Sequence, residues 1–485
     1  MEAFNNVVLS IKDFLWGPIM LCLLIGTHVL LTIRTKGIQR KTFTGVKLSV
    51  TPDKEASGDI GGFAALATAL AATIGTGNIV GVATAIGIGG PGAVFWMWFT
   101  GLLGMATKFG EATLAVKYRV KAADGSFIGG PMYALERGLG HKWLGVLFAI
   151  FTGIACFGIG NMTQANSIAE SMNGTFGVPK IATGIVLMII TGLVILGGVK
   201  SISKVCEKLI PLMAGLYIVG CIVICVINGA HIPAAFAAIV KGAFNPAAAG
   251  GGFVGATVVA CIRAGVSRGL FTNESGLGSA PLVAASAISK NPARQALVSM
   301  SGTFWDTVVI CLITGLMLVT SLLANPDLAA IYNNTMLASN DLSIDTAVGI
   351  FSGGAALATA CFESIPVLGP LVLVVGLLCF TYSTMLGWSQ YGDRAITYLF
   401  GTKGIRPYQV VFLLFVFWGC IGGGDLVWNL SDISNALMAV PNCIAVLVLS
   451  GVIAKGTKYW IYEGRLEEED TTPIPTVGTV DHPNV

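Results

Sequence analysis

The stretch from Ala64 to Ile86, AALATALAATIGTGNIVGVATAI, constrains the fold most, because it is long enough to cross a bilayer and carries no formal charge. Its centre reads Gly75-Thr76-Gly77-Asn78. A continuous helix disfavours such residues, since glycine costs a helix interior about 0.8–1 kcal/mol relative to alanine and Asn and Thr compete for backbone hydrogen bonds. Interrupted backbone is tolerated in hydrocarbon only where it is buried in protein or lines a wet cavity. A helix broken at mid-membrane therefore predicts a binding site made of backbone groups, a device typical of transporters.

The composition places this stretch in a polytopic membrane protein. Of the 485 residues, 54% are hydrophobic and 11% are charged, whereas soluble domains carry about 25% charged residues. No basic cluster interleaved with aromatic residues indicates nucleic-acid binding. The 11 cysteines form no CxxC pair and lie mostly in apolar runs, which indicates small core residues and not disulfides or metal ligands.

Apolar runs of about twenty residues predict an all-α polytopic membrane protein with about eleven transmembrane helices. One run is too long for a single span and is interrupted at Thr272–Gly276. The segment Thr346–Cys361 is apolar but short, so we expect it to cap the outer face. The predicted spans are Phe14–Ile33, Ala64–Ile86, Ala93–Val116, Leu144–Ala169, Ile181–Val199, Leu209–Ile227, the long run Ala247–Ala287, Ala296–Leu323, Val367–Leu399, Tyr408–Ile421 and Ile433–Ile453.

Lysine and arginine side chains fall in alternate loops of this prediction. The opposite loops are nearly free of them, and Asn325–Asp345 has three aspartates and no basic residue. By the positive-inside rule the basic loops are cytoplasmic, which places the N-terminus outside and the C-terminus inside. The basic loops contain Arg34, Lys36, Arg40 and Lys41; Lys117, Arg119 and Lys121; Lys200, Lys204 and Lys208; Lys290 and Arg294; Arg394, Lys403 and Arg406; Lys455 and Lys458.

The two interrupted spans divide the chain into halves. With the first span set aside, each broken helix begins a set of five spans, and an odd number makes the second set enter from the opposite face, as in an inverted repeat. We expect an N-terminal helix with a cytoplasmic basic loop (1–59), two five-helix repeats (60–228 and 229–455) and a cytoplasmic tail (456–485). The acidic tail around Glu467–Asp470, followed by prolines, is expected to be disordered and solvated.

Three motifs carry a resemblance to a known family. TALAATIGTGNIVGVATAIGIGGPGAVFW, RGLFTNESGLGSAP and GNMTQANS resemble the alanine or glycine:cation symporters, which are sodium-coupled amino-acid transporters of bacteria and archaea. The resemblance covers nearly the whole chain. It implies a LeuT-like 5+5 inverted repeat with one extra N-terminal helix. Ile74–Asn78 then resembles the unwound segment of the first core helix, and Phe271-Thr272 with Gly276 and Gly278 resembles that of the sixth.

An amino-acid zwitterion needs donors for its carboxylate and acceptors for its ammonium. Free amides at Thr76 and Gly77 open the second half of a broken helix, whose positive end favours an anion. Carbonyls near Phe271 can accept the ammonium, and Gln164 is a polar side chain at membrane depth. Bulky Phe271 and Trp388 can exclude larger side chains. The expected substrate-binding residues are Thr76, Gly77, Asn78, Gln164, Phe271, Gly276 and Trp388.

Sodium prefers roughly five or six oxygens, by analogy with other hard cations. Ala71 and Ile74 can supply carbonyls where the first helix unwinds. Ser383 and Thr384 form an adjacent hydroxyl pair with the Phe380 carbonyl one turn earlier, a spacing that resembles the superfamily's site between its first and eighth helices. Asn78 and Thr272 resemble ligands of a second sodium site found in some relatives.

Glu274 lies inside the second break, where charge at membrane depth indicates function. We expect it to pair with Arg268 or Arg263 and hold the break open; a proton carrier is the alternative.

Together these features predict an alternating-access symporter, not an enzyme, that imports alanine, glycine and similar small neutral amino acids with Na⁺ across a prokaryotic inner membrane. Its partners are the substrate, the sodium ion and the lipid bilayer. A proton-coupled permease of the same fold is the alternative. A channel is disfavoured because no polar stripe runs along the spans, and an intramembrane enzyme because the GxSxG string at Gly265–Gly269 lies in an apolar run without a strand-to-helix elbow.

Overall fold

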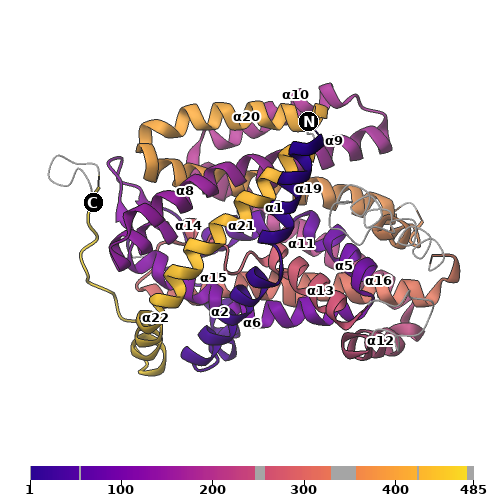
Figure 1. The fold of residues 1–485 in the computed structure, drawn as a ribbon, viewed down its shortest axis with the longest axis horizontal. Coiled ribbons are helices and arrows are strands. Elements are labelled where there is room, and N and C mark those ends of the chain that lie inside the picture. The colour runs from indigo at the N-terminus through magenta and orange to yellow at the C-terminus, as the bar shows by residue number, and fades with distance from the viewer. Residues whose placement is uncertain are drawn as a thin grey trace.

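A computed structural model describes residues 2–53, 56–245, 257–328, 357–366, 368–422 and 425–477. These residues are mostly helical and pack side by side as a bundle (Figure 1). The one sheet among them is a small antiparallel hairpin, in which Val120 of β1 (Val120–Lys121) lies opposite Ile128 of β2 (Phe127–Ile128).

The first part of the chain contains the first broken helix, α4 followed by η2 and α5. Its helices are α1 (Glu2–Leu15), α2 (Pro18–Arg34), η1 (Ile38–Lys41), α3 (Thr42–Ser49), α4 (Gly62–Thr73), η2 (Gly77–Gly81), α5 (Val82–Gly89), α6 (Gly92–Lys117), α7 (Pro131–Tyr133), η3 (Ala134–Gly138), α8 (Lys142–Phe157), η4 (Gly158–Met162), α9 (Thr163–Phe176), α10 (Lys180–Ile195) and α11 (Gly198–Ile227).

The second part contains the second broken helix, α13 followed by a non-helical segment and α14. Its helices are η5 (Gly229–His231), α12 (Ile232–Phe244), α13 (Val258–Asn273), α14 (Pro281–Ala284), α15 (Pro292–Thr303), η7 (Phe304–Cys311), α16 (Leu312–Ala324), α19 (Leu368–Phe400), η9 (Thr402–Gly404), α20 (Ile405–Gly422), α21 (Asp425–Val448), α22 (Ser450–Thr457) and η10 (Lys458–Tyr462).

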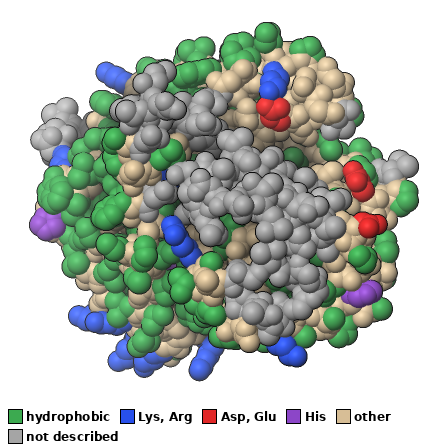
Figure 2. Space-filling view, turned by 45° about the vertical axis from the view of Figure 1, so that its right-hand side comes forward, with side chains coloured by type: hydrophobic (Ala, Val, Ile, Leu, Met, Phe, Trp, Pro, Cys, Tyr) green, Lys and Arg blue, Asp and Glu red, His purple; other side chains and the backbone are tan. Residues whose placement is uncertain are grey.

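By length and composition, 5 helices of the described residues can each cross a membrane, and three bent pairs raise this to 8 if each pair is one span. The expected count of about eleven is therefore not confirmed. The segment Thr346–Cys361, expected to cap the outer face, lies mostly outside the described residues. Large apolar side chains such as Leu193, Leu212 and Val259 are exposed. In Figure 2 hydrophobic side chains gather on the left side and along the upper edge of the face, as on a surface that contacts lipid.

Two terminal segments differ from the sequence-based expectation. The expected first span Phe14–Ile33 is preceded by a separate helix, because α1 ends at Leu15, Gly17 is extended and Pro18 begins α2. The acidic tail was expected to be disordered and solvated, but its described residues 463–477 form hydrogen bonds to the body of the protein. The expectation rested on the composition of the tail alone, and it did not include Lys290 and Arg294, which form ion pairs with Glu467 of the tail.

The two broken helices lie in the middle of the bundle. α13 packs on α5 and α6, while α4 packs on α11 and α19. Close approach depends on small residues: a Cβ on Gly387 of α19 would lie 2.7 Å from the backbone nitrogen of Ala72 on α4. The first broken helix is thereby held against α19.

Candidate functional site

The first break is held open by its own asparagine. The last helical bond of α4 runs from the Ile74 amide to the Leu70 carbonyl. The Gly75 amide would extend the helix by donating to Ala71, but it donates to the Asn78 side-chain oxygen instead (2.9 Å). The carbonyls of Ala71 and Ile74 are therefore released from the helical pattern. The two halves of the helix meet at 57°.

The amides of Thr76 and Gly77 open the second half of this helix. They precede the first helical hydrogen bonds of η2, so neither has a helical acceptor. Both residues are buried. Two amides at a helix N-terminus form an anion-binding group.

The second break is built by a parallel device on α13. The last helical bond runs from the Glu274 amide to the Leu270 carbonyl, and the Ser275 amide then donates to the Asn273 side-chain oxygen (2.9 Å). This releases the Phe271 carbonyl. Gly276 and Gly278 follow with φ of 94° and 81°, which only glycine adopts readily. The Asn273 side chain therefore ends the helix, and the two glycines with positive φ prevent a new helix from starting directly after it.

Glu111 of α6 fixes the chain beyond this break. One oxygen of its buried carboxylate accepts the amides of Gly276 (2.9 Å) and Gly278 (3.2 Å) and the side-chain amide of Asn442 (2.6 Å). Asn442 also donates to the Gly276 carbonyl (2.8 Å). Both polar backbone groups of Gly276 are thus engaged.

A cavity of about 20 Å³ lies between the two breaks. This is room for about one water molecule, so the site is contracted in this conformation. It is lined by both broken helices and by η4, α9, α19 and α21. The lining residues are Ala72, Thr73, Gly75, Thr76, Gly77, Ile159, Gln164, Phe271, Thr272, Glu274, Leu277, Thr384, Trp388 and Asn435.

Five of the seven expected substrate residues therefore meet at one cavity: Thr76, Gly77, Gln164, Phe271 and Trp388. Gly276 and Asn78 do not line it. Gly276 is held by Glu111 and Asn442. The Asn78 side chain points away, because it accepts from Gly75 and donates to the Asp306 carboxylate (2.7 Å).

Gln164 and Asn435 bring side-chain amides to the cavity. The Gln164 amide nitrogen donates to the Ile159 carbonyl (3.0 Å), and its oxygen has no hydrogen-bond partner. The oxygen of Asn435, on α21, likewise has none. Sequence reasoning missed Asn435, because a lone asparagine in an apolar span carries no positional signal until α21 is placed beside the breaks.

Glu274 also lines the cavity, which the sequence did not predict. Its carboxylate accepts a hydrogen bond from the Ser279 hydroxyl (2.5 Å) within the same break. The expected pairing with Arg263 or Arg268 is not formed. Those arginines precede the break on the regular helix α13, whereas Glu274 turns away with φ of 55°.

Trp388 reaches the cavity because the opposite helix carries a glycine. A Cβ on Gly160, in the π-helical turn η4, would overlap the Trp388 side chain. Such π turns within α-helices are frequent at functional sites. The indole is 1% exposed and also packs on Tyr391. The missing side chain of Gly160 thus leaves the space in which Trp388 packs against η4.

Four of the five expected sodium ligands, Ile74, Phe380, Ser383 and Thr384, bring oxygens together in a cluster between α4 and α19, and among the described residues no hydrogen bond joins the Ala71 carbonyl to them. The hydroxyls of Ser383 and Thr384 each donate to the Phe380 carbonyl at 2.9 Å. Thr384 also lies 3.4 Å from the Ile74 carbonyl. These spacings resemble the edges of a polyhedron around a cation with metal–oxygen distances of roughly 2.3–2.6 Å. The oxygens present therefore fit a hard cation.

The expected second sodium ligands, Asn78 and Thr272, also lie near one another, beside a carboxylate. The Asn78 amide and the Thr307 hydroxyl donate to the two oxygens of Asp306 (2.7 and 2.6 Å). The Thr272 hydroxyl lies 3.4 Å from that of Thr307. Asp306 is fully buried.

Residues 57–60 and 285–288, which we call the gate, are joined by hydrogen bonds at one end of the broken helices. The amides of Asp59 and Ile60 donate to the Ser286 carbonyl (2.8 and 3.2 Å), and the Ile288 amide donates to Ile60 (2.7 Å). Arg119 donates to the carbonyls of Ser57, Ala285 and Ala287 at 2.9–3.3 Å. Arg394 donates to the Ser286 hydroxyl (2.9 Å) and lies 3.8 Å from Asp59.

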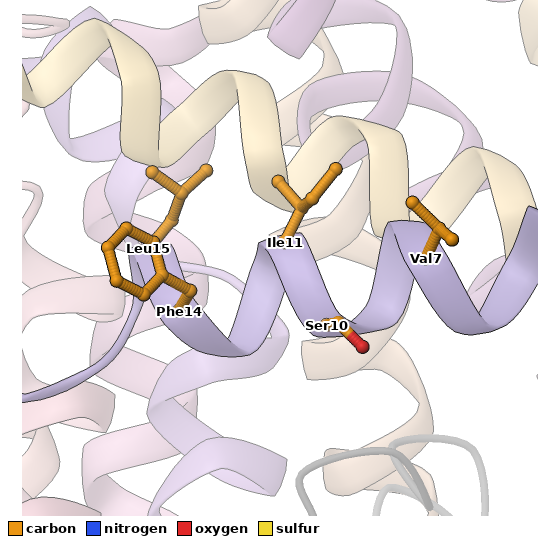
Figure 3. A pocket seen from close by; sticks show the side chains of 5 residues that line it. All are labelled: Val7, Ser10, Ile11, Phe14 and Leu15. Carbon is orange, nitrogen blue, oxygen red and sulfur yellow. The ribbon is translucent and has the colours of Figure 1, made fainter.

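A second hollow lies on α1 and lacks the chemistry of a polar site. Val7, Ser10, Ile11, Phe14 and Leu15 line it (Figure 3). Four of the five side chains are apolar, and Phe14 is 70% exposed. With one hydroxyl and no charge, this surface suits contact with lipid.

The comparisons with known proteins agree with this geometry. The model of the sodium:alanine symporter family matches residues 1–473. The sodium/alanine symporter AgcS of Methanococcus maripaludis is 48% identical over 463 residues, which are 94% of this chain and 97% of that protein. The putative sodium/proton-dependent alanine carrier YrbD of Bacillus subtilis is 33% identical over 449 residues, 92% of this chain and 90% of that protein.

Among solved structures, the crystal structure of MhsT in complex with L-phenylalanine matches with a TM-score of 0.53. It covers 80% of this chain and 88% of its own at 14% sequence identity. MhsT has the LeuT fold, so the likeness shows that architecture.

Proposed function

The chain belongs to the sodium:alanine symporter family, and on that premise we propose that it couples the uptake of alanine, glycine and similar small neutral amino acids to sodium. The observation that carries the proposal is the single cavity that joins both helix breaks to the oxygen cluster through Thr384. A symporter needs this proximity, because the ion and the substrate must favour the same conformation.

Substrate recognition follows from groups that the breaks release. The amides of Thr76 and Gly77 hold the carboxylate. The Phe271 carbonyl, the unpartnered oxygen of Gln164 and the side chain of Asn435 surround the ammonium. The walls formed by Trp388, Phe271 and Leu277, with a contracted volume of about 20 Å³, favour the smallest side chains. Each further methylene requires the site to expand against packed walls.

Sodium binds the carbonyls of Ala71, Ile74 and Phe380 and the hydroxyls of Ser383 and Thr384. It joins α4 to α19 and thereby preorganises the cavity. Opening at the gate separates residues 57–60 from 285–288, which draws α4 away from α19 and weakens the sodium site. The ion therefore binds the outward-facing form more tightly, as coupling requires.

The topology completes the proposal. We place the gate on the cytoplasmic side, because the basic loops lie there. The N-terminus is outside and the C-terminus inside. Residues 60–228 and 229–455 are the two inverted five-helix repeats, with residues 1–59 as an additional helix and loop. The membrane is the inner membrane of a prokaryote.

Radiolabelled alanine uptake into proteoliposomes tests the coupling. We expect accumulation when an inward sodium gradient is imposed with proton gradients collapsed, and competition by glycine and serine but not by leucine. The proposal fails if an imposed sodium gradient gives no accumulation above that of protein-free liposomes.

Proton coupling is the second candidate, and the carboxylate of Glu274 at the cavity favours it. If Glu274 carries a proton, a pH gradient alone drives uptake and Glu274→Gln abolishes that component. If sodium alone drives transport, Glu274→Gln retains sodium dependence. The same liposomes under the two gradients separate these outcomes.

A further inference from the structure

The chain after η10 lies across the gate end of the protein, where its trace runs along the edge of the molecule toward the C-terminus (Figure 1). We define residues 463–477 as the strap. We propose that the strap holds the gate shut and resists opening of the site to the cytoplasm. The cytoplasmic placement rests on the proposed function, whereas the contacts themselves do not.

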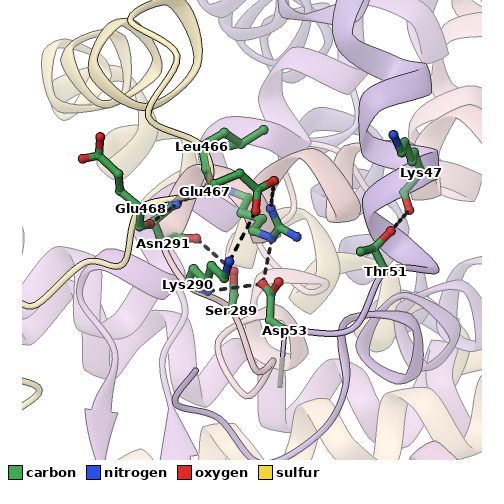
Figure 4. A network of polar contacts seen from close by, with 10 residues as sticks. Lys47, Thr51, Asp53, Ser289, Lys290, Asn291, Leu466, Glu467 and Glu468 are labelled. Carbon is green, nitrogen blue, oxygen red and sulfur yellow. Dashed lines mark hydrogen bonds and ion pairs between the residues drawn. The ribbon is translucent and has the colours of Figure 1, made fainter. Parts of the chain in front are cut away.

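The strap is attached to the corner between α14 and α15 by backbone and side-chain bonds. The side-chain amide of Asn291 donates to the backbone carbonyls of Leu466 and Glu468, both at 2.9 Å. The Asp470 amide donates to the Lys290 carbonyl (2.7 Å). Figure 4 shows Asn291, Leu466 and Glu468 meeting at this corner. These bonds join the strap to the segment that directly follows the gate residues 285–288.

A charge cluster joins the strap to both sides of the gate. Glu467 contacts Arg294 (2.6 Å) and Lys290 (3.3 Å). The guanidinium of Arg294 also contacts Asp53 (2.8 Å), on the chain that leads into gate residues 57–60. Arg294 is 5% exposed and Glu467 is 71% exposed. The buried guanidinium of Arg294 thus pairs with the carboxylate of Asp53 on the gate side and with that of Glu467 on the strap.

The far end of the strap reaches the gate through the hairpin β1–β2. The Lys121 amide donates to Pro475 and the Val477 amide donates to Lys121, both at 2.8 Å. On the other side of the hairpin, Phe127 donates its amide to Asp59 (2.9 Å) and accepts the Ser286 hydroxyl (2.9 Å). The hairpin therefore lies between the strap and the gate and contacts both.

These contacts indicate a releasable device. If the gate opens by moving the α14–α15 corner away from residues 53–60, either the strap bonds break or the strap and hairpin move as well. Its ion pairs are partly exposed, so each is weak and easily broken. The strap therefore adds resistance to opening without making opening impossible.

The test uses the full chain with two substitutions that weaken the strap. Glu467→Gln removes the charge that faces Arg294. Asn291→Asp removes the amide donor to the strap but keeps the oxygen that caps α15 by accepting from Arg294, at which Asp is as good as Asn. The control is Glu469→Gln, which removes an exposed strap carboxylate that forms no ion pair among the described residues.

Amide hydrogen exchange in nanodiscs reads out the strap and the gate separately. In the double variant we expect peptides from the strap to exchange faster and peptides covering 57–62 and 284–289 to exchange at least threefold faster than in wild type, with no change in the control. Faster exchange in the strap with an unchanged gate overturns the proposal, as does unchanged exchange in both. This readout needs no transport, so it stays independent of whether alanine and sodium are the cargo.

Discussion

The hydroxyl of Thr384 lies 3.4 Å from the carbonyl oxygen of Ile74, although 310 positions separate the two residues in the chain. Ile74 ends the first half of a broken helix, and Thr384 lines the same cavity as the released amides of Thr76 and Gly77. The contact therefore joins the proposed ion site to the proposed substrate site, so that a displacement of Thr384 or Ile74 changes the geometry of both sites.

Thr384→Val should weaken the response to sodium. The substitution keeps the shape of the side chain but removes one oxygen from the cluster. A bond to a charged group contributes about 1.5–3 kcal/mol, so the sodium concentration for half-maximal alanine uptake should rise by roughly 10- to 100-fold. Thr381→Val is the matched control, because Thr381 bonds only carbonyls of its own helix. Equal sodium curves for the two variants would remove Thr384 from the ion site.

Gly160→Ala should disturb Trp388 and reduce transport. The added methyl overlaps the indole-bearing side chain, so Trp388 must move into the cavity or α8 must shift. We expect at least a tenfold loss of alanine uptake and a changed tryptophan emission spectrum. Gly153→Ala, in the same bent helix, is the control, since its nearest new contact is Ile396 at 3.9 Å. Full activity in Gly160→Ala would show that Trp388 does not limit the cavity.

Asn435 tests the orientation of the substrate. If its amide faces the ammonium, Asn435→Asp should preserve or strengthen alanine binding, whereas the similarly sized Asn435→Leu should weaken it by roughly tenfold through the loss of a hydrogen bond to a charged group. If it faces the carboxylate instead, Asn435→Asp should be the more damaging change. Alanine competition curves on both variants decide between the two orientations, and two unaltered curves would exclude Asn435 from recognition.

The strap should respond to salt and to strong acid, but not to pH near neutrality. The Arg294 hydrogen bond holds the pKa of Glu467 below its usual value of 4.5. A carboxyl group with a depressed pKa stabilises the docked form above its free pKa and loses that contribution as pH falls through the lower, docked value. Hydrogen exchange of the strap should therefore stay constant from pH 8 to 6 at equal ionic strength, after correction for intrinsic exchange.

Raised ionic strength at neutral pH should release the strap, because it screens the exposed carboxylate. A strap that exchanges equally at about 0.05 M and 1 M salt would show that its backbone bonds alone hold it.

The two breaks could be located from sequence because their causes are local. Asn78 lies three residues after the amide it captures, and Asn273 lies two residues before Ser275. Gly276 and Gly278 mark backbone that cannot resume a helix at once. A spacing of one turn likewise placed Ser383 and Thr384 against Phe380.

Other parts of the site depended on contacts between distant segments. Asn435 reaches the cavity because α21 packs on α8. The backbone amide of Gly276 donates a hydrogen bond to Glu111, which lies on another helix. The tail is polar and contains prolines, yet it packs on the protein because Arg294 and Asn291, which are far away in the chain, donate hydrogen bonds to Glu467 and Leu466. Composition cannot report such partners.

The sequence by itself determined that the chain is a helical membrane protein with two interrupted helices, since hydropathy and the positions of glycine and asparagine act over a few neighbouring residues. The tertiary structure decided which released groups share one cavity, that Glu274 bonds Ser279 and not an arginine, and that the tail bonds to the corner between α14 and α15. Those outcomes depend on the relative placement of helices, because a hydrogen bond or an ion pair forms only between groups that the whole fold brings within about 3 Å.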